Sequence, residues 1–485
     1  MISLLPQRHY MVAKIWAGTA GVFVLTMLLS ESIAQPRNWT LKPDFNFAEY
    51  LDTSIPIPSD IDVRPKSADL TSNLARYAKW IKSQGPRIPR PRTHLTNLAV
   101  MLVEADRDDE SIAQLEILVR LPGRFDPVLQ SRRFMFLGDL RFHAGEYDTA
   151  VDAYRTAQQL THLHAGVLDD NQIVAVNRII RAKLQIMNGD PLKQQFDWLE
   201  TIDTDQQFTL FVHEREHGLG SAPYIERLLT VADYLQESAL ALRLPLVRQS
   251  TSAARSSDED SIMRTIYSEN RTLVDNVLQV RQNRFREATQ YYTTAIDALE
   301  DRLGSDHPSL IMPLTRLAEA HSRRNQHRQS RILRQRVVDI AVQSPLDVAD
   351  QVGIVIGAAD ALHRRGDDTA MKYYKMAWDM LSNPDDAPLR EQVLGEPQLI
   401  SRPLEEIRLR TLPQKPPVLI VSFNIPPNGQ PTGVMIVEST VNVVRQRSWI
   451  SKVERLVYRP RWGEDGPLTY TGIEQQARFI LPSKR

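Results

Sequence analysis

The sequence contains no cysteine in its 485 residues, and its formal net charge is zero. Without cysteine the chain can form no disulfide, and it offers neither a thiolate metal site nor a cysteine nucleophile. The lack of thiols also suits an oxidising compartment. Fifty-nine basic residues balance fifty-nine acidic ones, so the excess positive charge that binding to nucleic-acid phosphates requires is missing. We therefore expect no nucleic-acid partner.

Several motifs of catalysis are absent as well. The sequence has no glycine-rich phosphate loop, no nucleophile elbow and no acidic calcium loop, which are the short motifs that would indicate nucleotide, acyl-transfer or calcium chemistry. We therefore expect no enzymatic activity, no catalytic residue and no cofactor. The apolar share of 42% is typical of folded proteins. A chain of this length exceeds what one core supports, so we expect at least two folding units.

The amino terminus resembles an export signal. Basic residues precede an uncharged run over residues 15–29, and small residues follow at Ser32 and Ala34, the positions that a signal peptidase reads. A helix of that length would reach about 22 Å, less than the roughly 30 Å of a bilayer's hydrocarbon. The pattern predicts a signal peptide over residues 1–34 and a periplasmic or secreted protein. An uncleaved anchor, with membrane contact, is the alternative.

Prolines dominate the next segment, residues 35–92, with examples at Pro56, Pro58 and Pro86. A residue before proline is disfavoured in helical geometry, and only residues 67–81 show a helical period. We expect a loosely packed arm with one helix.

Residues 93–382 show paired helical periods with small residues at fixed offsets. The diagnostic stretch contains Leu137, Gly138, Gly145, Tyr147, Ala150, Tyr154 and Ala157. Small residues let two antiparallel helices approach closely, and Gly145 permits the turn between them. This spacing resembles a tetratricopeptide repeat, although Arg141 replaces the expected tyrosine and the terminal proline is missing. The resemblance implies a helical hairpin.

Two further stretches repeat the same spacing. They contain Ala288, Tyr292 and Ala295, and then Ala370, Tyr374 and Ala377. Weaker units occupy residues 95–120, 171–202 and 222–249, giving about six or seven hairpins in all. A single hairpin cannot bury its apolar face alone, so we expect the hairpins to stack into an α-solenoid. An irregular helical domain is the alternative.

A proline-rich linker over residues 383–416 leads to a module at residues 417–485 with a different period. Leu419, Val421, Phe423 and Ile425 alternate along one strand, and the Asn428-Gly429 step predicts a hairpin turn. A helix is expected over residues 448–457 and a last strand over 473–481. The order predicts a small α+β module, strand-strand-helix-strand, beside a mainly α array.

The stretch from Val421 to Gly429, together with the later Tyr458-Arg459-Pro460-Arg461-Trp462, resembles the C-terminal domain of TonB-like proteins. The resemblance implies that an extended peptide adds to a sheet edge, here near residues 475–481. An energy transducer keeps a membrane helix, usually containing histidine, and a long charged spacer. Residues 15–29 contain no histidine, and a helical array takes the place of the spacer.

One segment matches a zinc-hydrolase motif. His213 and His217 flank Glu214 in the pattern His-Glu-x-x-His, where the histidines ligate zinc and the glutamate activates water. The intervening Arg215 and Glu216 are costly to bury, and Glu237 is the candidate third ligand. Two glycines that follow at once indicate that the helix ends there. We therefore expect a solvated turn and no metal.

Together these patterns predict an exported, non-enzymatic scaffold of the bacterial cell envelope that binds protein or peptide partners. A TonB-like energy transducer, or a regulator of outer-membrane transport, is the first alternative. A zinc metallopeptidase that uses His213, Glu214 and His217 is the second.

Overall fold

The computed structural model describes residues 45–64, 70–84, 91–121, 126–189, 192–242, 257–401, 404, 407–408 and 417–480. The predicted signal peptide lies outside these residues. The described chain divides into two compact units, an N-terminal unit within Asn38–Arg281 and a C-terminal unit within Gln282–Arg485. Among the described helices, none combines the length and apolarity needed to cross a membrane.

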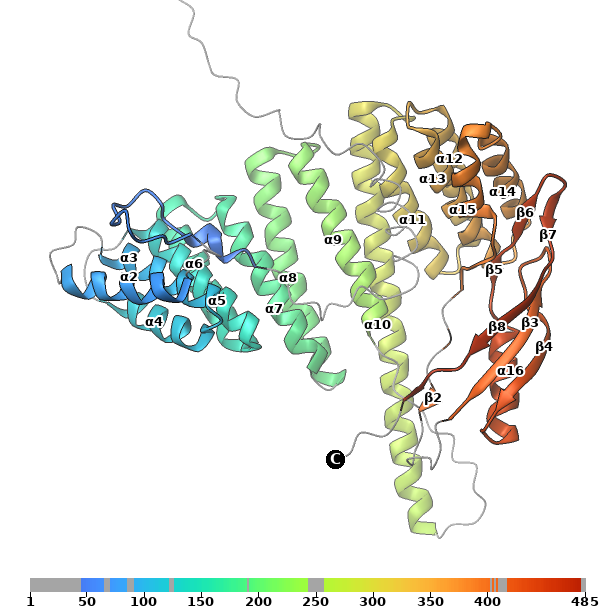
Figure 1. Cartoon of the computed structure of the whole chain (residues 1–485), viewed down its shortest axis with the longest axis horizontal. Coiled ribbons are helices and arrows are strands. Elements are labelled where there is room, and N and C mark those ends of the chain that lie inside the picture. The colour runs from blue at the N-terminus through green and yellow to red at the C-terminus, as the bar shows by residue number, and fades with distance from the viewer. Residues whose placement is uncertain are drawn as a thin grey trace, which may run out of the picture. The chain divides into compact units, whose positions relative to one another are not determined.

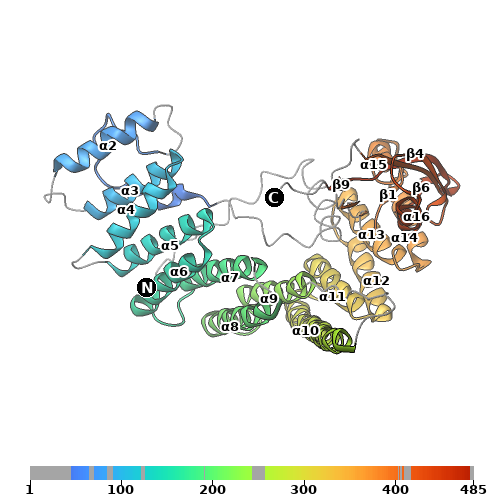
Figure 2. The same cartoon turned by 90° about the horizontal axis from the view of Figure 1, so that it is seen from below.

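The N-terminal unit is built from helices that each pack against the next one in the chain (Figure 2). It contains the 3-10 turn η1 (Phe47–Tyr50) and the helices α2 (Leu70–Gln84), α3 (Pro91–Glu104), α4 (Asp108–Arg120), α5 (Pro127–Ala144), α6 (Tyr147–Ala165), α7 (Asn171–Gly189), α8 (Leu192–His217) and α9 (Ala222–Ala241). Helix α10 (Ser257–Leu303) begins in this unit and continues into the other.

The hairpin of α5 and α6 shows why the repeat spacing folds in this way. Asp126 caps α5 by accepting a hydrogen bond from the Val128 amide, and α5 ends at Gly145 in the left-handed region at φ 84°, where a side chain would be strained. A Cβ at Gly138 would lie 2.4 Å from the Tyr154 ring. Gly138 is therefore required for the close approach of the two helices.

The C-terminal unit contains two further helical hairpins of its own, visible as neighbouring pairs in Figure 1. Its elements are the rest of α10, the turn η3 (Pro308–Leu310), α11 (Ile311–Arg323), α12 (His327–Gln343), α13 (Val348–His363), α14 (Thr369–Met380), the turn η4 (Pro384–Asp386) and α15 (Ala387–Leu394). The predicted fold class, a mainly α solenoid of stacked hairpins with a small α+β module, is confirmed.

The segment that we predicted as a linker also contributes to this unit. Helix α15 begins with proline in its first turn, where the missing amide hydrogen costs no hydrogen bond. Val393 and Leu394 at its end pack into the same core as Tyr374 and Trp462. Two short strands follow, β1 (Gln398–Leu399) and β2 (Ile407–Arg408).

The C-terminal module contains a three-stranded antiparallel sheet in the order β4-β3-β8 (Figure 1). Its elements are β3 (Leu419–Ile425), β4 (Thr432–Ser439), α16 (Val443–Val453), β5 (Tyr458–Arg459), β6 (Arg461–Gly463), β7 (Gly466–Leu468), β8 (Tyr470–Gln476) and β9 (Phe479–Ile480). Strands β6 and β7 form a hairpin, β5 pairs with β1, and β9 runs parallel to β2.

The residues that alternate along β3 are buried as expected. Leu419, Val421, Phe423 and Ile425 form one core cluster with Trp449 and Val453 of α16. Helix α16, however, lies earlier than the predicted 448–457. It begins after Asn442, whose side chain accepts a hydrogen bond from the Arg445 amide, and it ends at Val453, followed by a turn and then by the extended residues 458–459 of β5.

Candidate functional site

The repeat-signature residues lie inside the array. The alanines and the later tyrosine of each copy have no exposed surface: Ala150, Tyr154, Ala157, Ala288, Tyr292, Ala295, Ala370, Tyr374 and Ala377. Leu137 is also buried, Tyr147 packs against the same core from a partly exposed position, and Gly138 and Gly145 have the roles described for α5. These residues hold the helices together.

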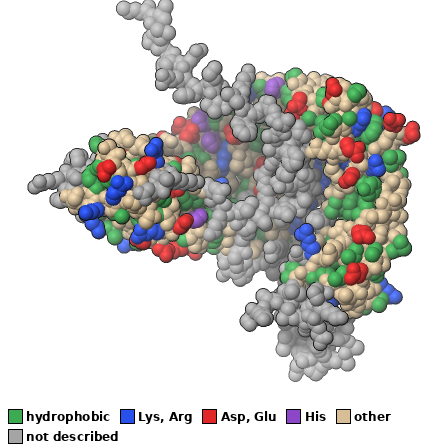
Figure 3. Space-filling view, viewed as in Figure 1, with side chains coloured by type: hydrophobic (Ala, Val, Ile, Leu, Met, Phe, Trp, Pro, Cys, Tyr) green, Lys and Arg blue, Asp and Glu red, His purple; other side chains and the backbone are tan. Residues whose placement is uncertain are grey.

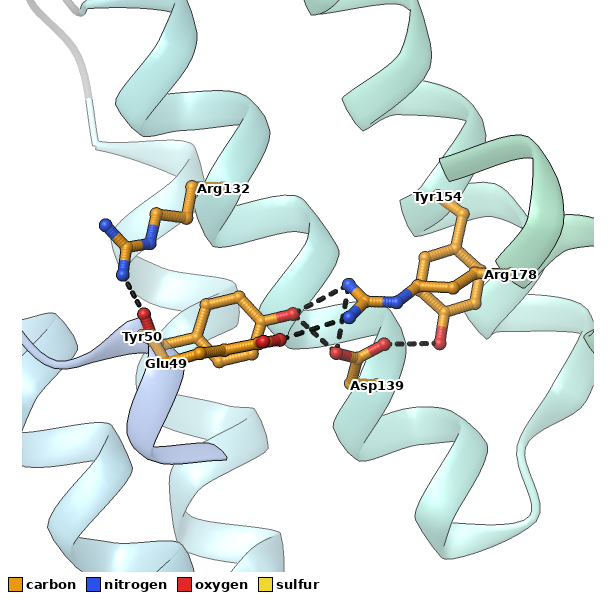
Figure 4. A network of polar contacts seen from close by, with 6 residues as sticks. All are labelled: Glu49, Tyr50, Arg132, Asp139, Tyr154 and Arg178. Carbon is orange, nitrogen blue, oxygen red and sulfur yellow. Dashed lines mark hydrogen bonds and ion pairs between the residues drawn. The ribbon is translucent and has the colours of Figure 1, made fainter. Parts of the chain in front are cut away.

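Asp139 of α5 is a fully buried carboxylate. It accepts a hydrogen bond from the Tyr154 hydroxyl at 2.8 Å and another from the Tyr50 hydroxyl, and Arg178 Nη1 lies 3.1 Å from it (Figure 4). Burial raises the pKa of Asp139 to about 6, against the opposing effect of the Arg178 charge. Tyr50 comes from the proline-rich arm, so the buried carboxylate joins the arm to the array.

The arm is held through its main chain as well. Asn97 of α3, itself fully buried, accepts a hydrogen bond from the Asp52 amide at 2.9 Å and donates to the Asp52 carbonyl at 3.0 Å. Arg132 of α5 donates to the Glu49 carbonyl (Figure 4). On α7, Arg178 pairs with the Glu49 carboxylate at 3.1 Å. The arm thus contacts the first helices of three successive hairpins.

Aromatic rings complete the contact. The Tyr50 ring stacks on Phe136 of α5 with centroids 4.5 Å apart, and Phe45 meets Phe142 edge to face at 5.6 Å. Phe47 is buried in the same cluster. Residues 45–54, here called the docked arm segment, are therefore not loosely packed as we expected of the arm. They lie on a surface formed by Asn97, Arg132, Phe136, Asp139 and Arg178, here called the arm-binding surface.

The C-terminal unit repeats this arrangement with a different partner. Asp360 of α13 accepts a hydrogen bond from the Tyr374 hydroxyl at 2.7 Å. Arg459 of β5 meets both carboxylate oxygens of Asp360, at 3.0 Å through Nε and 2.6 Å through Nη2, and also donates to the Val393 carbonyl at 2.7 Å. The C-terminal module is thereby anchored to the hairpin of α13 and α14.

The sheet of this module presents two outer strands. The outer strand β4 exposes Met435 and Val437, which are 66% and 54% exposed. Only part of the segment predicted to form a sheet edge, residues 475–481, lies on an outer strand of this sheet. Gln475 lies on the outer strand β8, but Phe479 and Ile480 pair with β2. On the face drawn in Figure 3, the described surface mixes acidic, basic and hydrophobic side chains.

The His-Glu-x-x-His segment is not the turn that we expected. It forms the last helical turn of α8, which ends at His217 before Gly218 in left-handed geometry, as the glycines indicated. The predicted third ligand Glu237 lies on α9, and Asp170 takes that place: ligand atoms of Asp170, His213 and His217 all lie within 4.8 Å of one another. Sequence reasoning missed Asp170 because no spacing rule links residues in separate elements.

Comparisons with known proteins do not place the chain in a family. No family model matches it, and no curated protein matches it. Among solved structures it is similar to BtubC (BKLC) from P. vanneervenii, at 12% identity and a TM-score of 0.33 over 58% of this chain and 96% of that one. The apo form of the quorum sensor NprR from B. thuringiensis matches at 11% identity and a TM-score of 0.17, over 64% and 94%. Such low scores carry no argument about function, which has to be inferred from the chain itself.

Proposed function

We propose that this protein is an exported, non-enzymatic scaffold of the bacterial cell envelope whose helical array binds short segments of partner proteins. The observation that carries the proposal is the docked arm segment. The array already holds a short piece of polypeptide, which includes the 3-10 turn η1, across α3, α5 and α7, through contacts of the kind that a peptide ligand would make.

Two features of this contact suit recognition of a partner. Asn97 and Arg132 bind main-chain groups, which any sequence presents. Asp139 and Arg178 bind the hydroxyl of Tyr50 and the carboxylate of Glu49, which selects an acidic residue followed by tyrosine. A partner segment with that pair would displace the arm, whose tether gives it a high local concentration.

The C-terminal module supplies the second contact in this proposal. Its resemblance to TonB-like domains suggests that a partner strand adds to a sheet edge, and the exposed apolar side chains of β4 give such a strand a surface to cover. The predicted signal peptide and the absence of cysteine favour an envelope location. The lack of catalytic motifs favours binding over catalysis.

Cross-linking in cells followed by purification from the envelope fraction tests the proposal. Phe47→Ala/Tyr50→Ala should weaken arm docking and increase the recovery of partners. Adding Asn97→Ala and Arg178→Ala should abolish that recovery, whereas Arg107→Ala, which removes only an exposed pair with Glu110, should leave it unchanged. Recovery that is the same in all four proteins would contradict the proposal.

Two further measurements test its remaining parts. Sequencing of the mature amino terminus should find Gln35 as the first residue, and an intact Met1 in every cell fraction would contradict export. The variant Met435→Lys/Val437→Lys should lose the partners that bind through β4 and keep those that bind through the arm-binding surface. Retention of both sets would exclude β4 as a contact.

A further inference from the structure

Three side chains capable of binding a metal converge where α7 begins and α8 ends. His213 and His217 lie one turn apart on α8, with ring centroids 5.6 Å apart. Asp170 lies directly before α7 and faces both rings: its Oδ2 is 2.6 Å from His217 Nε2, and its Oδ1 is 3.8 Å from His213 Nδ1. All three belong to the N-terminal unit.

Two of these atoms lack a hydrogen bond. Asp170 Oδ1 and His213 Nδ1 are both buried, and neither has a hydrogen-bond partner within the described part of the chain. Leaving buried polar atoms unpaired costs free energy. Two ligands of a tetrahedral ion with bonds of 2.0–2.2 Å lie about 3.3 Å apart. Around a metal the 3.8 Å gap between Asp170 Oδ1 and His213 Nδ1 would close by roughly 0.5 Å, and the 2.6 Å contact between Asp170 Oδ2 and His217 Nε2 would open by roughly 0.7 Å.

Of the two Asp170 oxygens, Oδ2 is hydrogen-bonded to His217 Nε2 and only Oδ1 has no partner. Asp169 accepts hydrogen bonds from the amide and the side chain of Asn171 at the start of α7. Asp170 therefore points toward the end of α8.

We propose that Asp170, His213 and His217 bind one divalent transition-metal ion of the zinc class. Two imidazoles with one carboxylate are ligands that zinc accepts, whereas calcium and magnesium prefer sites made of oxygen alone. The side chains of His217 and Asp170 are 30% and 43% exposed, so water can reach a fourth position. The ion would tie the start of α7 to the end of α8.

This site differs from the hydrolase that the sequence pattern suggests. Glu214, which would act as the base, does not belong to the cluster, and neither does Glu237. The third ligand comes from the segment before another helix. In this proposal the ion stabilises the packing of the start of α7 against the end of α8. This role does not depend on the proposed binding of peptides.

Zinc binding to the full chain, prepared without an affinity tag and stripped with a chelator, tests this inference. Calorimetry should find one zinc ion per chain, and Co²⁺ should give the visible absorption of a tetrahedral site. His213→Asn/His217→Asn should remove both signals. Asp170→Asn should weaken binding by about 100-fold or more, since even loss of a supporting group costs up to that much.

His143→Asn is the matched control. His143 pairs with Asp108 at 3.3 Å on the surface of the same unit. Among the described residues it belongs to no group of three possible metal ligands. This variant should therefore bind zinc as the wild type does. Circular dichroism verifies that each variant folds. No binding by the wild type, binding that persists in the double variant, or equal loss in His143→Asn would overturn the inference.

Discussion

Asp139 and Asp360 occupy equivalent positions in two hairpins that lie in different units. Each is on the first helix and accepts a hydrogen bond from the tyrosine of the second, Tyr154 at 2.8 Å and Tyr374 at 2.7 Å. Each also meets an arginine from another element. In one hairpin this carboxylate holds the arm, and in the other it holds the C-terminal module.

The pair of Arg459 and Asp360 should contribute strongly to the stability of the C-terminal unit. Removing one partner leaves the other charge buried and unpaired, which costs about 3–5 kcal/mol. We expect Arg459→Ala to lower the free energy of unfolding by that amount in urea titrations. Asp379→Ala, which breaks an exposed pair with Lys375, should cost less than about 1 kcal/mol. Equal costs would contradict an anchoring role for Arg459.

The close approach at Gly138 predicts a specific coupling between two residues. In Gly138→Ala the new methyl would meet the Tyr154 ring, so we expect a loss of about 1–3 kcal/mol from overpacking. In a Tyr154→Leu background the same substitution should cost much less, because the ring has gone. A double-mutant cycle by urea unfolding measures the coupling. If the costs of the two substitutions simply add, the cost of Gly138→Ala does not come from its contact with the Tyr154 ring.

The buried carboxylate of Asp139 predicts a pH dependence. Its pKa in the folded chain is about 6, above the ordinary 3.8, so the folded state holds this proton more tightly than the unfolded state does. The resulting stabilisation is complete below about pH 4 and is lost as the pH rises through 6. Urea titrations at several pH values measure this effect. Between pH 5 and 7.5 the free energy of unfolding of the wild type should fall by about 1 kcal/mol more than that of Asp139→Asn. If the free energy of unfolding changed with pH in the same way in both proteins, the raised pKa of Asp139 would be contradicted.

The local patterns of the sequence anticipated the fold class and several details. Small residues at helical spacing predicted the hairpins, because two helices can approach closely only where side chains are small. The alternation along β3 predicted its buried face, and Gly218 marked the end of α8. The cap at Asn442 was missed because the expected helix was placed from its first large apolar residue, Trp449.

Contacts between distant segments could not be predicted. Asn97 binds the main chain of Asp52, 45 residues away, and Arg459 meets Asp360 across 99 residues. Neither pair has a spacing that a sequence pattern can reveal. The proline-rich arm was predicted to be loose because its many X-Pro steps discourage helix. Its burial depends on side chains that the array supplies.

The most direct test of the scaffold account is the binding of a labelled peptide of residues 44–56 to the full chain, followed by fluorescence anisotropy. The account predicts weak binding to the wild type, whose own arm occupies the arm-binding surface, and tighter binding to Phe47→Ala/Tyr50→Ala. Adding Asn97→Ala and Arg178→Ala should abolish the binding. The account would be contradicted if the peptide bound all of these proteins with the same affinity, or if it bound none of them.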